Sequence, residues 1–255
     1  MTPARHDDRI RRWSKWSNFE PQDQWDLYLK VIDEACARGI EFALGGAFAV
    51  ATYTGHWRNT KDLDLYVRPS GREKLIQVLT ALGLKDYYDE KPYDRWWIYR
   101  GCKQGTIVDI IWAMANHRRQ IDGLWMSGPT VDVRGRQLKV LPAEALIWDK
   151  LYIVQRERCD WPDILNLLYH AAADLDWYGL LQRLGDDQPL LAGLLNLFRW
   201  VAPGRAQTIP SSVWAALALP PMPRAPLPEI DRRRAALLDR RPWFGPKQEE
   251  PQPAD

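Results

Sequence analysis

Two short segments decide the fold: FALGG at residues 42–46, and NTKDLDLYV at residues 59–67. The first segment predicts an apolar strand that runs into two glycines, and a helix is expected to follow them. The second predicts a strand that begins with Asp62 and Asp64, separated by one leucine. Because side chains alternate faces along a strand, both carboxylates point to the same face. Adjacent carboxylates repel each other unless a cation lies between them, so the pattern predicts a metal site with a phosphate group beside it.

A third acid is expected to join this pair. The segment 106–112 predicts an apolar strand with Asp109 in its middle, where a carboxylate is costly to bury without a cation or hydrogen-bond partners. Placed beside the first two acids in a mixed sheet, Asp109 would complete a cluster with Asp62 and Asp64. Three carboxylates can hold two Mg²⁺ (or Mn²⁺) ions about 3.5–4 Å apart, the arrangement used for in-line phosphoryl displacement. Asp109 taken alone could instead be neutral or paired with an arginine.

The paired glycines suit a phosphate next to that metal. Gly45 and Gly46 lack side chains, so phosphate oxygens could approach the backbone N–H groups that open the following helix. In this interpretation Asp62 and Asp64 hold the metal bound to a nucleoside triphosphate. Asp109 then helps a second metal to lower the pKa of an acceptor hydroxyl, or acts as the general base itself.

Periodicity along the chain predicts the fold class. Strands and helices alternate up to residue 140, and apolar residues at helical spacing dominate from residue 141 to 200. We therefore expect an α/β (α+β) protein, with a mixed sheet and a helical C-terminal appendage. The expected divisions are a basic N-terminal arm at 1–20, a catalytic domain at 21–140, a helical domain at 141–202, and a Pro-rich linker, short helix and polar tail at 203–255.

The composition of the chain argues against several classes of partner and site. The chain has 255 residues, with 35 Lys plus Arg against 33 Asp plus Glu, so the net charge of +2 gives no general field for nucleic acid. Three widely spaced cysteines argue against disulfides and zinc clusters, and fit a reducing cytoplasm. No apolar run is long enough to cross a membrane.

The motifs resemble those of a known superfamily. Leu44-Gly45-Gly46, then Asp62-Leu63-Asp64, then Val108-Asp109 is similar to the signature of the nucleotidyltransferase-fold, or polymerase-beta-like, superfamily. The segment RNTKDLDL at residues 58–65 resembles the uncharacterised bacterial nucleotidyltransferases and the abortive-infection type toxin nucleotidyltransferases. Many members carry Gly-Ser where this chain has two glycines. The resemblance implies that Mg²⁺ and an NTP such as ATP are used, and a toxin of this kind would have an antitoxin partner.

The resemblance also assigns residues outside the acid cluster. Arg58 and Thr60 would belong to the nucleotide-binding set with the two glycines. The segment LPAEALIWDK at 141–150 is similar to a helical motif in which a lysine reaches the triphosphate, so Lys150 would contact phosphates. Asp163 would be a supporting acid. Without the resemblance, Lys150 could be a helix-surface lysine and Asp163 an acid that the helix dipole favours.

Two functions follow from this interpretation. The first is a metal-dependent nucleotidyltransferase that moves an NMP from an NTP to a hydroxyl and releases pyrophosphate. Its acceptor could be a small molecule such as an aminoglycoside-like antibiotic, a tRNA end or a protein side chain. The second is a non-catalytic nucleotide-binding or interaction protein that retains the fold.

Overall fold

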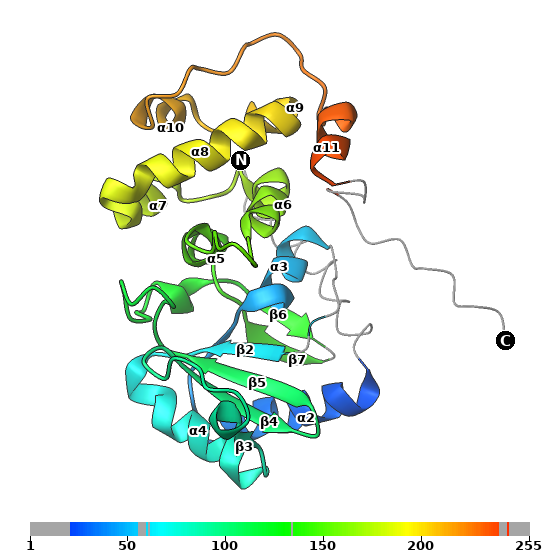
Figure 1. Cartoon of the computed structure of the whole chain (residues 1–255), viewed down its shortest axis with the longest axis vertical. Helices are drawn as coiled ribbons and strands as arrows, with labels where there is room; N and C mark the ends of the chain where they lie inside the picture. The colour runs from blue at the N-terminus through cyan, green and yellow to red at the C-terminus, as the bar shows by residue number, and fades with distance from the viewer. Residues whose placement is uncertain (1–20, 56–59, 61, 134, 240–243, 245–255) are drawn as a thin grey trace, which may run out of the picture.

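A five-stranded mixed sheet forms the lower half of the molecule in Figure 1. The computed structural model describes residues 21–55, 60, 62–133, 135–239 and 244. The strand order is β1-β2-β5-β4-β3, and only the β2–β5 pair is parallel. The strands span Ala43–Leu44 (β1), Asp62–Tyr66 (β2), Lys85–Asp86 (β3), Ile98–Lys103 (β4) and Thr106–Ile111 (β5).

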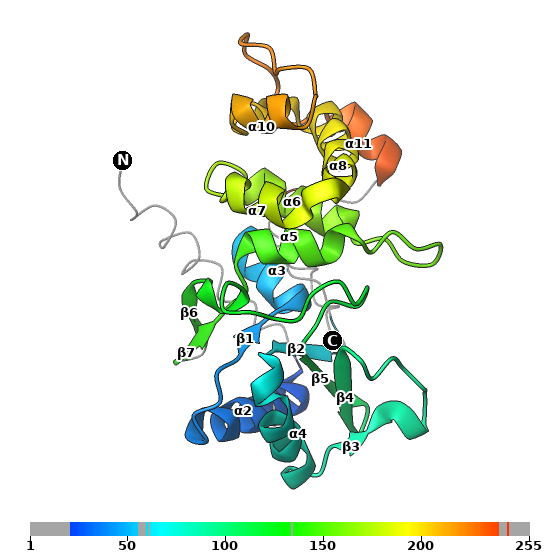
Figure 2. The same ribbon diagram turned by 90° about the vertical axis from the view of Figure 1, so that its left-hand side faces the viewer.

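One face of this sheet is covered by two amphipathic helices, α2 (Gln22–Ala37) and α4 (Arg72–Ala81). Figure 2 shows them together on one side of the strands. Both helices contact β5, and they contact each other. Leu63 and Leu65 are fully buried, while the aspartates that alternate with them are only half-buried. The strand alternation therefore directs the leucines to the core and the acids to the opposite face.

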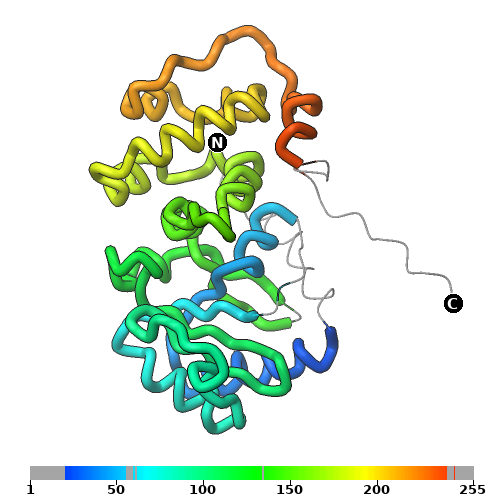
Figure 3. The backbone as a smooth tube through the Cα atoms, in the orientation of Figure 1, coloured from blue at the N-terminus to red at the C-terminus, as the bar shows by residue number. Residues whose placement is uncertain are grey.

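Helix α3 (Gly46–Thr54) lies between the sheet and a helical layer. Eight of its nine residues are buried, which explains why it is apolar on all sides. It contacts β2 below and both α5 and α6 above. Figure 3 shows the chain passing from the sheet to this upper layer. The layer contains α5 (Ala143–Leu151), α6 (Trp161–Ala171), α7 (Trp177–Leu184) and α8 (Gln188–Val201).

Shorter elements complete the body of the protein. A separate antiparallel hairpin consists of β6 (Thr130–Val133) and β7 (Arg136–Lys139), and β7 contacts β1. Single-turn 3-10 helices occupy Pro69–Gly71 (η2), Tyr87–Asp89 (η3), Trp125–Ser127 (η4) and Gly185–Asp187 (η5).

The segment after residue 202 differs from the predicted linker. It contains α9 (Pro203–Ala206) and α10 (Ser211–Ala216) before α11 (Arg232–Leu238). Trp214 is only 1% exposed, and Arg199 on α8 donates to the carbonyl of Pro220 (2.6 Å). Pro203 and Pro210 stand at the beginnings of α9 and α10, where a proline is tolerated, and the hydrogen bond from Arg199 holds the loop after α10 against α8.

The predicted fold class is confirmed: the protein has a mixed α/β structure with helices at its C-terminal end. The edge strand β3 has only two residues, whereas β4 and β5 have six residues each. Among the described helices, none has the length and apolar character needed to cross a bilayer.

Candidate active site

The sheet brings the three predicted acids together. Asp64 on β2 lies directly beside Asp109 on β5 in the parallel pair, and Asp62 shares their face. One carboxylate oxygen from each residue lies within 4.8 Å of the other two. We call these residues the three-acid cluster. Asp109 is almost fully buried, whereas Asp62 and Asp64 are half-buried, so the cluster opens to solvent on the β2 side.

Arg100, which was not predicted from the sequence, lies on the same part of the sheet. It lies opposite Asp109 in the antiparallel β4–β5 pair. Its Nε donates to Asp109 Oδ1 (2.8 Å) and its Nη2 to Asp109 Oδ2 (2.5 Å). The same Nη2 lies 3.8 Å from Asp62 Oδ2. The guanidinium therefore forms a two-pronged hydrogen-bonded pair with one acid of the cluster and reaches a second.

The glycine pair fits tightly against the cluster. Gly46 has φ +52°, in the left-handed region, and a Cβ at this position would lie 1.7 Å from Asp64 Oδ2. A Cβ on Gly45 would lie 2.1 Å from the Tyr66 ring. The N–H of Gly45 donates to the carbonyl of Asp64 (3.0 Å), so this group is engaged within the protein. The open N–H groups at the start of α3 are those of its first turn.

Electrostatics explains why this cluster favours a cation. The pKa of Asp64 is raised well above its ordinary value, first by burial and then by the charges of Asp62 and Asp109. Lys150 and Arg100 offset only part of that effect. Burial also raises the pKa of Asp109 to about 6, despite its pair with Arg100. The positive charges of the protein thus leave the cluster short of cationic compensation.

The donor atoms suit a hard divalent cation. Carboxylate oxygens are the ligands that Mg²⁺ and Mn²⁺ prefer, and three of them converge here. The open side toward β2 leaves room for phosphate oxygens as further ligands. Asp62, Asp64 and Asp109 therefore fit such an ion by residue type, convergence and charge.

The loop before β2 adds a hydroxyl to the cluster. The Thr60 hydroxyl donates to Asp62 Oδ1 (2.7 Å), and Gln24 Nε2 donates to the Thr60 carbonyl (3.3 Å). Thr60 thus orients one of the acids. Arg58, also predicted to bind nucleotide, lies outside the described residues.

Lys150 and Asp163 meet in an ion cluster between α5 and α6. Lys150 Nζ donates to Asp160 Oδ2 (2.7 Å) and to Asp163 Oδ2 (2.8 Å), with its side chain only 6% exposed. Burial lowers the pKa of Lys150, but the charges of Asp163 and Asp160 outweigh burial and the net change is upward. Lys150 also acts electrostatically on Asp64. The predicted phosphate-contacting lysine is therefore close to the three-acid cluster, but it is paired with two carboxylates.

Arg158 extends this ion cluster toward solvent. Its Nε donates to Asp160 Oδ1 (2.9 Å), while its side chain is 61% exposed. It lies in a hairpin loop between α5 and α6, closed by the bridge between Val154 and Cys159. Figure 2 shows this loop projecting from the helical layer on the same side of the molecule as β4 and β5. Neither Arg158 nor Asp160 was selected from the sequence.

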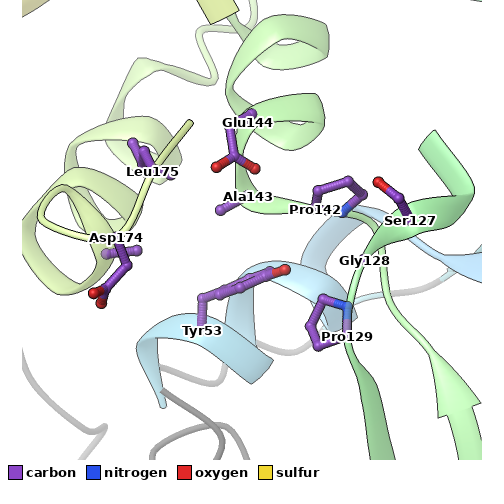
Figure 4. Close-up of a pocket in the computed structure, with 10 residues that line it drawn as sticks. Tyr53, Ser127, Gly128, Pro129, Pro142, Ala143, Glu144, Asp174 and Leu175 are labelled. Atoms are coloured by element: carbon purple, nitrogen blue, oxygen red, sulfur yellow. The ribbon is translucent and has the colours of Figure 1, made fainter. Parts of the chain in front are cut away.

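A separate cavity of about 230 Å³ lies beside the C-terminal end of α3. Figure 4 shows the Glu144 carboxylate and the Tyr53 ring at its wall. Tyr53 donates to the carbonyl of Leu141 (2.8 Å), and Leu175 and Asp174 lie across from it. None of the residues that line this cavity belongs to the three-acid cluster.

Comparison with known proteins identifies the family. A family model described as "uncharacterised nucleotidyltransferase" matches residues 30–200. The chain therefore belongs to this nucleotidyltransferase family, and it is an enzyme of nucleotidyl transfer. The resemblance drawn from the glycine pair and the acids is confirmed. No curated protein sequence matches the chain.

Three solved structures are similar to this chain at low identity. The solution structure of the antibiotic-resistance factor ANT(2'')-Ia is 20% identical, covering 76% of this chain and 94% of its own, with a TM-score of 0.43. The lincosamide antibiotic adenylyltransferase LnuA with lincomycin bound is 18% identical, covering 56% and 94%, with a TM-score of 0.42. A nucleotidyltransferase-like protein from Paracoccidioides brasiliensis is 18% identical, covering 67% and 91%, with a TM-score of 0.38. Likeness at this level leaves the substrate of this chain open.

Proposed function

We propose that the three-acid cluster binds an NTP through Mg²⁺ or Mn²⁺, and that the enzyme moves the NMP from it to a hydroxyl acceptor. One observation carries the proposal: the carboxylate oxygens of Asp62, Asp64 and Asp109 converge within 4.8 Å, on the sheet face next to the start of α3. A cation bound there would supply positive charge to the phosphates and to the attacking oxygen. Family membership supports the transfer of a nucleotidyl group.

The proposed reaction is an in-line displacement at the α-phosphorus of the NTP. The acceptor oxygen forms a bond to the α-phosphorus of the NTP, and the bond from that phosphorus to the bridging oxygen of the β-phosphate breaks. Pyrophosphate leaves with the electron pair of that bond. The proton of the acceptor hydroxyl passes to a carboxylate of the three-acid cluster or to solvent. Asp109 is the candidate base, because it lies beside Asp64 in the cluster and burial raises its pKa above the ordinary value.

The surrounding residues take supporting roles in this proposal. Gly45 and Gly46 bring the first turn of α3 beside Asp64, where its N–H groups and the helix dipole favour phosphate. Thr60 orients Asp62 through its hydroxyl. Lys150 supplies positive charge next to Asp64. Direct contact between Lys150 and phosphate stays a prediction. Two of the three N–H donors of its ammonium group bond to Asp160 and Asp163, and the third is the one that a phosphate oxygen would accept.

The biological role of the enzyme depends on which molecule accepts the NMP. A small molecule such as an antibiotic, a tRNA end and a protein side chain all carry the hydroxyl that this chemistry needs. A protein or RNA acceptor would agree with a cytoplasmic toxin and an antitoxin partner. In this scheme residues 21–140 form the catalytic domain and residues 141–202 the helical domain that covers it.

A transfer assay tests the proposal. Purified protein is incubated with each of four α-labelled NTPs, Mg²⁺ and a cell extract, and the transfer of label and the release of pyrophosphate are measured. Asp64→Asn removes a charged metal ligand. The transition state should lose several kcal/mol of stabilisation, which corresponds to a rate lower by about 100-fold or more. Asp89→Asn is the matched control, because Asp89 is exposed and lies outside the cluster.

Two results would contradict the proposal. Transfer that survives Asp64→Asn unchanged would place the chemistry elsewhere. The second result is NTP binding that depends on Mg²⁺ but leads to no transfer, either in the whole extract or in its separated RNA, protein and small-molecule fractions. That result would favour the non-catalytic alternative.

A further inference from the structure

Arg100 is a positive group in direct contact with the three-acid cluster. Its Nη2 lies between Asp109 Oδ2 at 2.5 Å and Asp62 Oδ2 at 3.8 Å. Its Nε engages the second oxygen of Asp109 as well. Both oxygens of the most buried acid in the cluster are therefore already bound by a positive group.

A divalent ion held by the same oxygens would lie next to the guanidinium. Two cations a few ångströms apart in a partly buried site repel each other strongly, because little water screens them. The Arg100 side chain is 29% exposed, whereas that of Asp109 is 2% exposed. Of the two partners, only Arg100 therefore has a route toward solvent.

We propose that Arg100 is an internal counterion that competes with the divalent cation for Asp109. All three acids hold the cation only after the two hydrogen bonds from Arg100 to Asp109 have broken. This inference rests on the proposed function for the identity of the metal ligands. Arg100 would then set how tightly the protein binds the metal in the absence of nucleotide.

The proposal also couples the metal to the nucleotide. A guanidinium released from Asp109 stays at the mouth of the site, anchored by β4, and phosphate oxygens are strong bidentate partners for it. An NTP would therefore compensate the loss of the Arg100–Asp109 pair. Binding of the metal and binding of the NTP should each strengthen the other, as linkage requires.

A purely structural role for Arg100 predicts the opposite response. If Arg100 only holds Asp109 in position, removing it would disorder a ligand and weaken metal binding. If Arg100 competes with the metal, removing it would strengthen metal binding. The sign of the change therefore separates the two roles.

The experiment measures Mn²⁺ binding to the full chain without nucleotide, by electron paramagnetic resonance of the free ion. Four proteins are compared: the wild type, Arg100→Gln, Arg100→Lys and Arg158→Gln. Arg100→Gln should bind Mn²⁺ at least about tenfold more tightly than the wild type. The Mn²⁺ affinity of Arg100→Lys should lie between those two, because lysine keeps the positive charge but cannot form the two-pronged pair with Asp109.

Arg158→Gln is the matched control for charge alone. Arg158 also acts electrostatically on Asp64 and Asp62, but its hydrogen bonds go to Asp160. Its removal should change Mn²⁺ affinity by less than about threefold, the effect of a screened charge without direct contact. Thermal melting without metal checks that each variant is folded, and Arg100→Lys gives a second test if Arg100→Gln is not.

The outcomes separate the inference from the proposed function. Equal or weaker Mn²⁺ binding by Arg100→Gln would overturn the inference, as would an equal gain in Arg158→Gln. The same titrations with a non-hydrolysable NTP analogue should tighten Mn²⁺ binding more in the wild type than in Arg100→Gln. If neither protein binds Mn²⁺ with or without the analogue, both the inference and the proposed metal site fail.

Discussion

At the scale of single residues, the space around Asp64 explains why position 46 is a glycine. Members of the superfamily often have a serine there, and this chain lacks its hydroxyl. The structure gives a physical reason, because a Cβ at position 46 would overlap the Asp64 carboxylate at 1.7 Å. The positive φ of Gly46 adds a backbone cost for any other residue.

Gly46→Ala should therefore lose both stability and metal binding. The left-handed backbone costs about 1–2 kcal/mol, and the displaced Asp64 carboxylate should weaken Mn²⁺ binding as well. Gly39→Ala is the matched control, since Gly39 has φ +64° and a Cβ at this position would have no atom within 4 Å. Urea unfolding and Mn²⁺ titration should show the backbone cost in both variants and the loss of binding only in Gly46→Ala. Equal binding by both variants would contradict this account of the glycine.

Of the residues in the site, the three acids could be predicted from the sequence, and Arg100 was not. The three acids were identified because strand alternation places Asp62 and Asp64 on one face, and a buried Asp109 needs a partner. The partner Arg100 was missed, although a signal was present. Gln104 and Gly105 form the β4–β5 turn with φ +52° and +81°, and a two-residue turn there pairs residue 100 with residue 109.

At the scale of elements, an ion cluster joins the end of α5 to the start of α6. Lys150 bonds to Asp160 and Asp163, and Arg158 bonds to Asp160 from the hairpin loop. The sequence marked Lys150 and Asp163 through a resemblance to a family motif, but helical periodicity could not show that they contact each other. That contact depends on how the loop between the two helices folds, which local pattern does not determine.

Asp160→Asn should destabilise the protein in a pH-dependent way. Burial opposes ionisation of Asp160, but Arg158 and Lys150 outweigh it and lower its pKa to about 2. Because this pKa lies below that of the unfolded chain, the stabilisation is complete above about pH 5 and is lost as the pH falls toward 2. Breaking such a buried pair costs about 3 kcal/mol at pH 7.

Urea unfolding of the wild type and Asp160→Asn from pH 3 to pH 7 measures this effect. The difference in unfolding free energy should be constant from pH 7 to about pH 5 and then shrink. Asp89→Asn, at an exposed position, should match the wild type throughout. A difference that grows as the pH falls, or no difference at pH 7, would contradict the ion-cluster account.

At the scale of the whole molecule, the layers place the site between the sheet and the helices. The order of the periodic segments predicted a mixed sheet with a helical C-terminal appendage, but not the position of the site between them. It did not predict α9 and α10, because helices of four and six residues form only through tertiary contacts. Trp214 on α10 is buried beneath Arg199 of α8, whose guanidinium lies 5.3 Å from the ring centroid.

Trp214→Ala therefore tests whether this C-terminal part belongs to the core. Removing a buried tryptophan should cost about 3–5 kcal/mol of unfolding free energy, without changing Mn²⁺ affinity at the distant acids. Leu237→Ala on α11 is the control, because Leu237 is 77% exposed. If the two variants unfold alike, residues 203–239 contribute little to the core and act as the linker that the prolines predicted.

The most direct test of the central claim is anomalous scattering from crystals of the protein grown with Mn²⁺ and a non-hydrolysable NTP analogue. We expect a Mn²⁺ peak among the carboxylates of Asp62, Asp64 and Asp109, with the triphosphate beside the first turn of α3 and Arg100 turned away from Asp109. A bound nucleotide with no Mn²⁺ peak at these three residues, or with Mn²⁺ held elsewhere, would contradict the claim that they form the metal–nucleotide site.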